Sequence, residues 1–437
     1  MKQESIGVGI LGLGVIAGHV ARVLTDKAEE LSGKIGCDLV LRKIKVLPQD
    51  LERPLARELP AELFTTDDDE FFNTPGIDIV VEAIGGENPA LEYHRRALSG
   101  GKHVVTSNKE LIAKHGLDLL ALAHENGVGL LYEASVGGGI PLIAPFKHDL
   151  VANTITGIFA IINGTTNYIL TRMDHEGMDF ATALKQAQEL GYAEPDPTND
   201  IEGYDARYKL AILASLAFQT PVSPDEVYCE GITRLSSRDF RYARELGFAI
   251  KLLAIAKSSD SSIEVRVHPV FIPQDSMLAK VEGVYNAVQV EGDLVGKTMF
   301  IGEGAGASAT TSAVIADVVS SARKICLGIG SISMWKKAGN RRIKPMEEIE
   351  TQYYIRLNAV DSSGVLARIA TVFGENQISI ASAIQPESDD VTQTAEIVIM
   401  THPAREKAMQ KTLGDLQNLD VVREISNFIR VEEIEGG

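Results

Sequence analysis

A glycine-rich turn near the start of the chain joins the first predicted strand, residues 6–11, to a predicted helix over residues 15–28. Between them, Gly12-Leu13-Gly14-Val15-Ile16-Ala17 follows the pattern G-x-G-x-x-G/A. Glycines here allow a tight turn and bring backbone N–H groups close to a pyrophosphate, which the helix N-terminus stabilises. The turn therefore predicts a dinucleotide site formed by Gly12, Leu13, Gly14, Val15 and Ile16.

The segments that follow the turn continue the alternation of strand and helix. Strands are predicted at residues 38–46, 77–82 and 103–106, with helical patterns between them. Such alternation implies parallel strands with crossover helices. We therefore expect an α/β fold, a Rossmann-type doubly wound parallel sheet, over residues 1–140.

The rest of the chain is expected to form two further domains. Mixed strands and helices predict an α+β catalytic and dimerisation domain over residues 141–330. A Gly-rich, basic stretch then suggests a linker at residues 331–350. Residues 351–437 follow the order βαββαβ, with a helix at 365–375 and a strand at 394–401, which is typical of a ferredoxin-like module.

Composition excludes several classes of partner and location. The chain has 42 Lys and Arg against 60 Asp and Glu, a net charge of −18, which argues against nucleic acid as a partner. Its three cysteines, Cys37, Cys229 and Cys326, are far apart and suggest neither a disulfide framework nor a zinc site. Neither a secretory signal nor an apolar stretch of membrane-spanning length is evident, so we expect a cytoplasmic protein with no membrane partner.

The segment after the second strand should distinguish NAD from NADP. An acidic residue there would bind the ribose 2′-hydroxyl of NAD, whereas an arginine would accept the 2′-phosphate of NADP. The chain has Gln49-Asp50 and, three residues after Asp50, Arg53. Asp50 favours NAD and Arg53 could favour NADP, so both cofactors remain open.

Two further segments could carry ligands. Lys109 follows the strand at 103–106, at the carboxyl edge of the sheet where open α/β folds bind ligands, although it could equally be a solvated helix-start residue. Glu133 precedes three consecutive glycines, Gly137 to Gly139. Their backbone carbonyls could turn toward a ligand or a monovalent cation, or the segment could be an interdomain hinge.

The densest group of polar residues lies between Gly191 and Lys209. Asp205 and Lys209 are four residues apart and share a face of the predicted helix. The helix continues into an almost wholly apolar segment, residues 210–218, so it should enter a core. Lys209 is therefore a candidate proton donor and acceptor beside Glu194, Asp200 and Asp205, which could hold the amino group of a substrate.

Three segments of the chain resemble signature blocks of the homoserine dehydrogenase family. They are Asn163 to Leu170, Gly191 to Lys209, and Glu133 to Pro141. The resemblance implies reversible NAD(P)-dependent conversion of aspartate 4-semialdehyde to L-homoserine, in threonine and methionine biosynthesis, by a homodimer or homotetramer. It implies Lys209 as general acid/base, Lys109 at the nicotinamide and substrate, and homoserine bound by Glu194, Asp205 and Asp200.

The same resemblance extends to a metal and a second glycine-rich loop. It implies a sodium ion held by Glu133 and the backbone carbonyls of Val136, Gly138 and Ile140. Gly302 would begin a loop near the cofactor. Two residues depart from the family pattern: Glu303 stands where proline is common, and Gln49 where many members have arginine.

The C-terminal module resembles an ACT domain, a ferredoxin-like unit that binds amino acids. Asp361, Gly364, Val365 and Leu366 match its first strand-to-helix turn, where helix-start N–H groups could receive a ligand carboxylate. The resemblance implies feedback control, with threonine as the effector. A module used only for dimerisation is the alternative.

Two other functions remain to be weighed. Another semialdehyde oxidoreductase, aspartate-semialdehyde dehydrogenase, needs a thiol nucleophile, and no cysteine lies near these motifs. A non-catalytic amino-acid sensor on a dehydrogenase scaffold is expected to lack the acid/base residue, yet Lys209 and Glu194 are both present.

Overall fold

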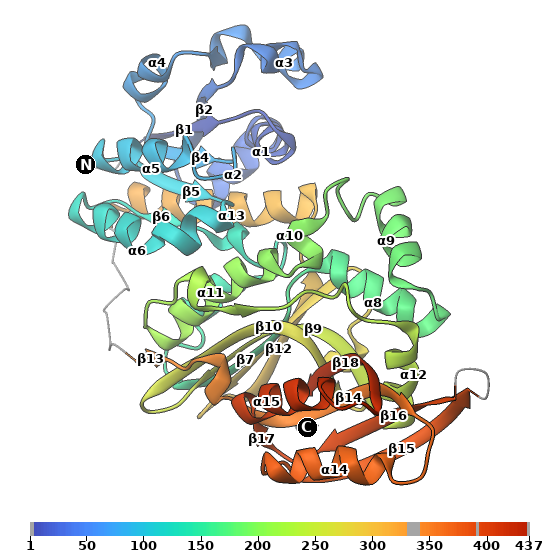
Figure 1. Ribbon diagram of the computed structural model, residues 1–437. Helices are drawn as coiled ribbons and strands as arrows, with labels where there is room; N and C mark the ends of the chain where they lie inside the picture. The colour runs from blue at the N-terminus through green and yellow to red at the C-terminus, as the bar shows by residue number, and fades with distance from the viewer. Residues whose placement is uncertain (1–3, 330–340, 390–392, 435–437) are drawn as a thin grey trace. The chain divides into compact units, whose positions relative to one another are not determined.

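The computed structural model describes residues 4–329, 341–389 and 393–434. The chain divides into two compact units, each assembled from segments that lie far apart in the sequence (Figure 1). The first contains Met1–Ile155, Tyr208–Asp225 and Gly292–Asn340; the second contains Thr156–Arg207, Glu226–Glu291 and Arg341–Gly437.

The first unit contains a six-stranded parallel sheet in the order β3-β2-β1-β4-β5-β6. Its strands are β1 (Ser5–Leu11), β2 (Asp38–Lys45), β3 (Phe64–Thr65), β4 (Ile79–Glu82), β5 (His103–Thr106) and β6 (Leu130–Leu131). Its helices include α1 (Val15–Asp26), α2 (Ala28–Ile35), α3 (Pro54–Glu58), α4 (Asp68–Asn73), α5 (Ala90–Ser99), α6 (Lys109–Glu125), α7 (Ile143–Lys147) and α13 (Ala307–Cys326). The Rossmann-type sheet predicted from the sequence is confirmed, and its strand order reverses beside β1, where such sheets bind ligands.

The core of the first unit lies on the face of the sheet covered by α1 and α13. Ile6, Val8 and Ile10 of β1 are fully buried, and Val314 and Val318 of α13 join the same cluster. Helix α13 has 20 residues. Although it lies within the stretch assigned to the substrate domain, it packs on the sheet of the first unit.

The second unit contains a mixed sheet whose strands follow the order β11-β7-β9-β10-β18-β14-β16-β15. These strands are β7 (Ile155–Ile161), β9 (Phe248–Ser258), β10 (Ser262–Pro273), β11 (Tyr285–Gly292), β14 (Glu350–Val360), β15 (Ile380–Asp389), β16 (Thr394–Thr401) and β18 (Val422–Val431), with β8 (Tyr228–Cys229), β13 (Arg342–Ile343) and β17 (Ala404–Arg405) off this path. Its helices are α8 (Gly164–Glu176), α9 (Phe180–Glu189), α10 (Thr198–Ile201), α12 (Ser237–Glu245), α14 (Val365–Glu375) and α15 (Glu406–Gln417). The chain passes between the units within β7, within α11 (Tyr204–Phe218), after Asp225 and at the end of β11, which β12 (Gly296–Glu303) follows.

The C-terminal module has the predicted order βαββαβ, and its sheet continues the sheet of the second unit through β18 and β10. Because side chains alternate along a strand, β14 presents two different faces. Tyr353, Ile355 and Leu357 pack in the cluster that includes residues of α14 and α15. Tyr354 and Arg356 point the other way and bond to Asp239 of α12. Part of the predicted linker, residues 331–340, lies outside the described residues.

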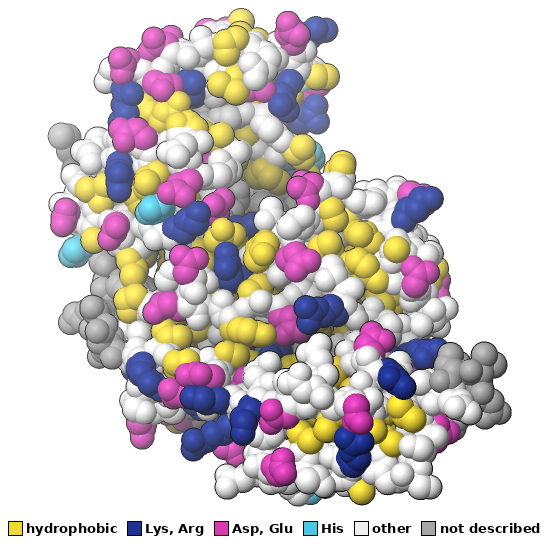
Figure 2. All heavy atoms as spheres, in the orientation of Figure 1, with side chains coloured by type: hydrophobic (Ala, Val, Ile, Leu, Met, Phe, Trp, Pro, Cys, Tyr) yellow, Lys and Arg dark blue, Asp and Glu magenta, His cyan; other side chains and the backbone are white. Residues whose placement is uncertain are grey.

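Within the described part of the chain, every helix is too short or too polar to traverse a lipid bilayer. On the face of the molecule seen in Figure 2, Lys and Arg side chains are interspersed with Asp and Glu side chains.

Candidate active site

The glycine-rich turn has the geometry of a dinucleotide site. The Gly12 N–H donates to the Lys45 carbonyl at 2.8 Å, and Gly12 has a φ of +97°, a conformation that favours glycine. Gly14 is the residue before α1, and a Cβ placed on it would meet no atom within 4 Å. Val15, the first residue of α1, is 67% exposed. The helix N-terminus is therefore open to a ligand, and its N–H groups fit a pyrophosphate.

Asp50 lies in a short 3₁₀ helix, Pro48–Glu52, directly after β2. Its carboxylate is buried and accepts the Leu47 N–H at 3.1 Å and the Arg53 Nε–H at 2.7 Å. The two residues that favoured opposite cofactors thus form one ion pair. A role for Asp50 at the ribose stays a prediction.

A buried carboxylate joins the ends of two neighbouring strands in the first unit. Glu82, the last residue of β4, is fully buried and accepts the Thr106 hydroxyl at 2.7 Å and the Ile84 N–H at 2.7 Å. Thr106 is the last residue of β5. The sequence analysis did not identify Glu82. An acidic residue at the end of an otherwise apolar parallel strand could have indicated it, because a buried carboxylate needs hydrogen-bond partners.

The same network continues to the start of α6. The Thr106 hydroxyl oxygen accepts the Asn108 N–H at 2.9 Å. Asn108 caps α6, because its side-chain oxygen accepts the Leu111 N–H at 3.1 Å while its amide donates to the Gly86 carbonyl at 2.6 Å. Lys109 is the first residue of that helix. The carboxyl edge of the sheet therefore fixes the backbone from which Lys109 projects.

An asparagine brings two of the predicted substrate carboxylates together in the second unit. The side-chain amide of Asn163 donates to Asp200 at 2.7 Å and to Asp205 at 2.9 Å. Its oxygen accepts the Thr166 N–H at 2.9 Å, which caps α8. Asn163 begins one of the segments that resemble the family, but nothing in its sequence position indicated that it would hold both aspartates.

Lys209 and Asp205 lie on α11 four residues apart, as the spacing predicted, and both are buried. Leu210, Leu213 and Ala214 are also buried, so the helix does enter a core. Glu194 lies in the loop between α9 and α10, with its side chain exposed. The structure therefore joins Asp200 and Asp205 through Asn163, and leaves Glu194 on the surface of the same polar segment.

The predicted cation loop is built around the carboxylate of Glu133. Its two oxygens accept the N–H groups of Leu142, Ile143 and Ala144 at 2.6, 2.8 and 2.8 Å. Glu133 therefore anchors the start of α7. Ionised carboxylates can accept about four hydrogen bonds, so these contacts are compatible with one further ligand.

Two glycine-rich loops approach each other in the first unit. The Gly139 N–H donates to the Glu303 carbonyl at 3.2 Å. A Cβ on Gly138 would lie 2.6 Å from the Gly304 carbonyl oxygen, and one on Gly302 would lie 3.2 Å from the Ile140 side chain. The predicted cation loop and the returning loop at Gly302 are thus in direct contact, which the sequence did not show.

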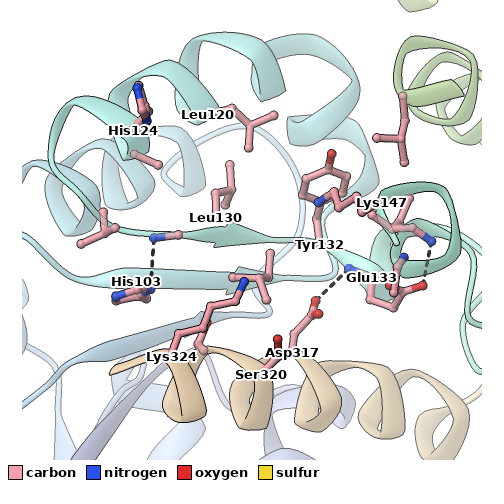
Figure 3. Close-up of a pocket in the computed structure, with 18 of the residues that line it drawn as sticks. His103, Leu120, His124, Leu130, Tyr132, Glu133, Lys147, Asp317, Ser320 and Lys324 are labelled. Carbon is pink, nitrogen blue, oxygen red and sulfur yellow. Dashed lines mark hydrogen bonds between the residues drawn. The ribbon is translucent and has the colours of Figure 1, made fainter. Parts of the chain in front are cut away.

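A small cavity of about 150 Å³ lies beside Glu133 in the first unit (Figure 3). Asp317 on α13 accepts the Glu133 N–H at 2.8 Å, and burial raises the pKa of Asp317 to about 7. Tyr132, Lys147 and Lys324 also line the cavity. The segment that begins at Glu133 is therefore attached to α13 as well as to α7.

The turn predicted to bind an effector precedes α14. Gly364 is the residue before the helix and has a φ of +89°, and Leu366 is 45% exposed. The Gln385 amide donates to Asp361 at 3.4 Å. Effector binding by Asp361, Gly364, Val365 and Leu366 stays a prediction.

Comparison with known proteins shows matches along the whole chain. Residues 12–133 match the NAD binding domain of homoserine dehydrogenase, residues 141–319 match homoserine dehydrogenase, and residues 353–421 match the ACT domain. Homoserine dehydrogenase from Neisseria gonorrhoeae is 42% identical, with 99% of this chain and 100% of the relative covered. The chain belongs to the homoserine dehydrogenase family. It is accordingly an NAD(P)-dependent oxidoreductase.

Solved structures of the family show the same fold. A homoserine dehydrogenase from Thiobacillus denitrificans has a TM-score of 0.91 and 40% identity, with all of both chains covered. A hyperthermophilic archaeal homoserine dehydrogenase in complex with NADPH has a TM-score of 0.61 and 28% identity, over 73% of this chain and 98% of that one. The resemblance found from the sequence blocks is therefore confirmed.

Proposed function

We propose that the chain catalyses the reversible reduction of aspartate 4-semialdehyde to L-homoserine. The observation that supports this most directly is the acidic cluster in which Asn163 holds Asp200 and Asp205, one helical turn before Lys209. Two carboxylates fixed by one amide form an anionic site for the α-ammonium group of an amino-acid substrate. Membership of the homoserine dehydrogenase family points to the same reaction.

In this proposal Lys209 moves the proton at the C4 oxygen. During oxidation its amine accepts the hydroxyl proton of homoserine, and during reduction its ammonium returns that proton to the aldehyde oxygen. Asp205, Asp200 and Glu194 bind and orient the substrate, and Lys109 lies at the nicotinamide and substrate. NAD(P), when bound, supplies the hydride donor or acceptor. A steady-state assay of homoserine oxidation tests the reaction, and absence of turnover with both cofactors contradicts it.

The proposed cofactor site comprises Gly12 to Ile16, Asp50, Lys109 and Gly302. The open N-terminus of α1 supports it, as does the family match of residues 12–133. The archaeal relative bound to NADPH supports NADP as one cofactor. Asp50 and Arg53, which favour opposite cofactors, are paired with each other, so both NAD and NADP should be tested. The ratio of kcat/KM for NADP to that for NAD measures the preference.

The open space at Gly14 gives a specific prediction. Gly14→Val should weaken NAD(P)H binding at least tenfold, because the new side chain would occupy the start of α1 where the pyrophosphate is expected. It should leave the unfolding midpoint unchanged, since a Cβ there meets no atom within 4 Å. Titration of bound NADPH fluorescence measures the affinity. Gly33→Val, at another glycine with open space, is the matched control and should bind the cofactor normally.

A second prediction concerns the amide between the two aspartates. Asn163→Ala should raise the KM for homoserine by roughly 10–100-fold, because Asp200 and the buried Asp205 lose the amide donor that fixes both carboxylates. Cofactor affinity should not change. Asn126→Ala, which removes an exposed amide bonded to the Leu122 carbonyl, is the control. An unchanged KM in Asn163→Ala would place the substrate elsewhere.

The sodium ion expected from the family belongs to the same proposal. Glu133 and the carbonyls of Val136, Gly138 and Ile140 are oxygen donors of the kind that alkali and alkaline-earth cations prefer. Gly138 lies close to the Gly304 carbonyl, so the loop that contains Gly138 packs against the returning loop. A sodium ion bound to this loop would order it. Comparison of the unfolding midpoints in sodium chloride and in tetramethylammonium chloride tests whether sodium binds.

The thiol-dependent alternative receives no support from Cys229 or Cys326. Burial raises the pKa of the Cys229 thiol to about 11, so this group is protonated at neutral pH. Cys326 is buried in the core of the first unit. Acyl-enzyme chemistry needs an activated thiolate, which Cys229 does not offer.

Feedback control by threonine, through the C-terminal module, is the regulatory part of the proposal. The ACT match of residues 353–421 supports it. The same assay with added threonine tests the control, and sedimentation velocity tests the expected homodimer or homotetramer. Unchanged rates at saturating threonine would contradict the regulatory part while leaving the reaction intact.

A further inference from the structure

A buried histidine of α5 faces the carboxylate of Glu82. The His94 side chain is fully buried, and its Nε2 lies 3.8 Å from Oε2 of Glu82. Its Nδ1 lies 2.8 Å from the Ala90 carbonyl oxygen. Because a carbonyl oxygen can only accept, Nδ1 carries the proton of that bond. Nε2 is therefore the nitrogen that gains or loses a proton, and it has no hydrogen-bond partner among the residues that the structure describes.

The charge of this pair depends on the proton at Nε2. With the proton, an imidazolium lies beside the carboxylate and the two charges cancel; without it, a lone pair faces the carboxylate. Burial lowers the pKa of His94, although the Glu82 carboxylate acts in the opposite direction. Lys114 and His115 of α6, the helix that packs against α5, bond to Glu87. Neutral His94 is therefore the form favoured at neutral pH.

Glu82 joins two parts of the proposed cofactor site. Its Oε1 accepts the N–H groups of Ile84 and Gly85 at 2.7 and 3.2 Å, and its Oε2 accepts the Thr106 hydroxyl at 2.7 Å. A Cβ on Gly12 would lie 3.6 Å from the Ile84 side chain. The loop that Oε1 holds therefore lies against the glycine-rich turn.

The second oxygen of Glu82 acts on the helix that carries Lys109. Thr106 also accepts the Asn108 N–H at 2.9 Å, and Asn108 is the N-cap of α6. The Asn108 amide returns to the same loop, because it donates to the Gly86 carbonyl at 2.6 Å. Glu82 thus closes a ring of hydrogen bonds, within the first unit, that fixes both the loop at residues 84–86 and the start of α6.

We propose that Glu82 and His94 are positioning residues for the dinucleotide, and that cofactor binding is coupled to release of the proton on His94. The Nε2–Oε2 distance of 3.8 Å exceeds the roughly 2.7–3.2 Å of an N–H···O hydrogen bond. An imidazolium would draw Oε2 toward Nε2 and away from Thr106, which would loosen the loop and the start of α6. Neutral His94 leaves the carboxylate with its three donors, so this form binds the dinucleotide more tightly. The proposal rests on the proposed function, which places the dinucleotide at Gly12 and Lys109.

The coupling is tested by the pKa of His94 in the free and in the cofactor-bound protein. The chain has nine histidines, so labelling with ¹³C at Cε1 gives few NMR signals, and the signal missing in His94→Asn identifies His94. Its pKa should fall on saturation with NAD⁺ or NADP⁺, whichever binds more tightly, because binding and proton release are reciprocal. A pKa that is equal in the two states, or a His94 that does not titrate while the protein is folded, overturns the proposal.

Calorimetric titration of the full-length protein with the same cofactor measures affinity without turnover. The ratio of the Kd at pH 5.0 to that at pH 7.5 should be at least threefold larger in the wild type than in His94→Asn, whose amide can donate to the Ala90 carbonyl but does not titrate. Titration of the cofactor itself is common to both proteins and cancels. His94→Phe keeps a ring without a titratable nitrogen and should behave like His94→Asn. His148→Asn, at an exposed histidine after α7, should keep the wild-type ratio.

Replacing Glu82 with glutamine tests the ring of hydrogen bonds itself. The amide oxygen can still accept from Ile84 and Gly85, but the side chain offers no second acceptor to Thr106. The Kd at pH 7.5 should rise at least fivefold, whereas Glu125→Gln, at an exposed glutamate of α6, should bind the cofactor normally.

The outcomes separate this coupling from the proposed function. Wild-type affinity in Glu82→Gln, or equal pH ratios in the wild type and both His94 variants, overturns the coupling alone. Absence of binding of both NAD⁺ and NADP⁺ to the wild type contradicts the proposed cofactor site and the coupling together.

Discussion

Replacing Lys209 with alanine is expected to lower the turnover of homoserine oxidation by roughly 10²–10⁴-fold, the range that general acid/base groups contribute. The amine lies on α11, one turn after Asp205, at the end where the helix becomes buried. Without it, the proton of the C4 hydroxyl has no positioned acceptor. The dinucleotide should still bind, because the glycine-rich turn lies on different elements.

Single-turnover kinetics with saturating cofactor and homoserine measure the effect on the chemical step. Lys209→Met keeps most of the side-chain volume, so it separates the loss of the amine from the loss of packing. Lys185→Ala, at an exposed lysine on α9, is the surface control and should be fully active. Turnover near the wild-type rate in Lys209→Met would remove Lys209 from the proposed role.

Features set by neighbouring residues were predictable from the sequence. Helix α14 begins at Val365 and ends at Glu375, as predicted, and β16 spans Thr394–Thr401. In both segments the apolar pattern and the flanking turn lie within a few residues of the element they define. The same holds for Asp205 and Lys209, whose shared face follows from helix geometry alone.

Contacts between distant segments could not be read in this way. Glu82 meets Thr106 only because β4 and β5 are adjacent, and Asn163 reaches Asp205 only after β7 and α11 have packed. An acidic residue or an asparagine at a strand end has many partners in principle. The choice among them depends on strand order, which the alternation of strand and helix does not determine.

The contacts that attach the C-terminal module to the rest of the second unit also could not be predicted from the sequence. Arg356 of β14 donates to Asp239 of α12 at 2.8 Å and to Glu396 of β16 at 3.0 Å. Although burial alone would raise the pKa of Glu396, hydrogen bonds from Tyr242 and Arg356 lower it. A second buried pair joins Arg266 of β10 to Glu432 at 2.6 Å. Deletion of residues 351–437 would therefore leave Asp239 and Arg266 without these buried partners, so point substitutions are the better test of the module.

Replacing Arg356 with methionine is expected to lower the free energy of unfolding by about 3–5 kcal/mol, because it leaves a buried carboxylate at Asp239 without its cation. The side chains of Arg356 and Asp239 are 7% and 0% exposed. Arg368 pairs with Asp420 on the surface, where the side chains are 49% and 77% exposed, so Arg368→Met should change stability by less than about 1 kcal/mol. Urea unfolding of both variants measures the difference.

In the double variant Arg356→Met with Asp239→Asn much of the loss in unfolding free energy should be recovered, since the uncompensated charge is gone. Equal, small losses in Arg356→Met and Arg368→Met would show that the buried network does not hold the module in place.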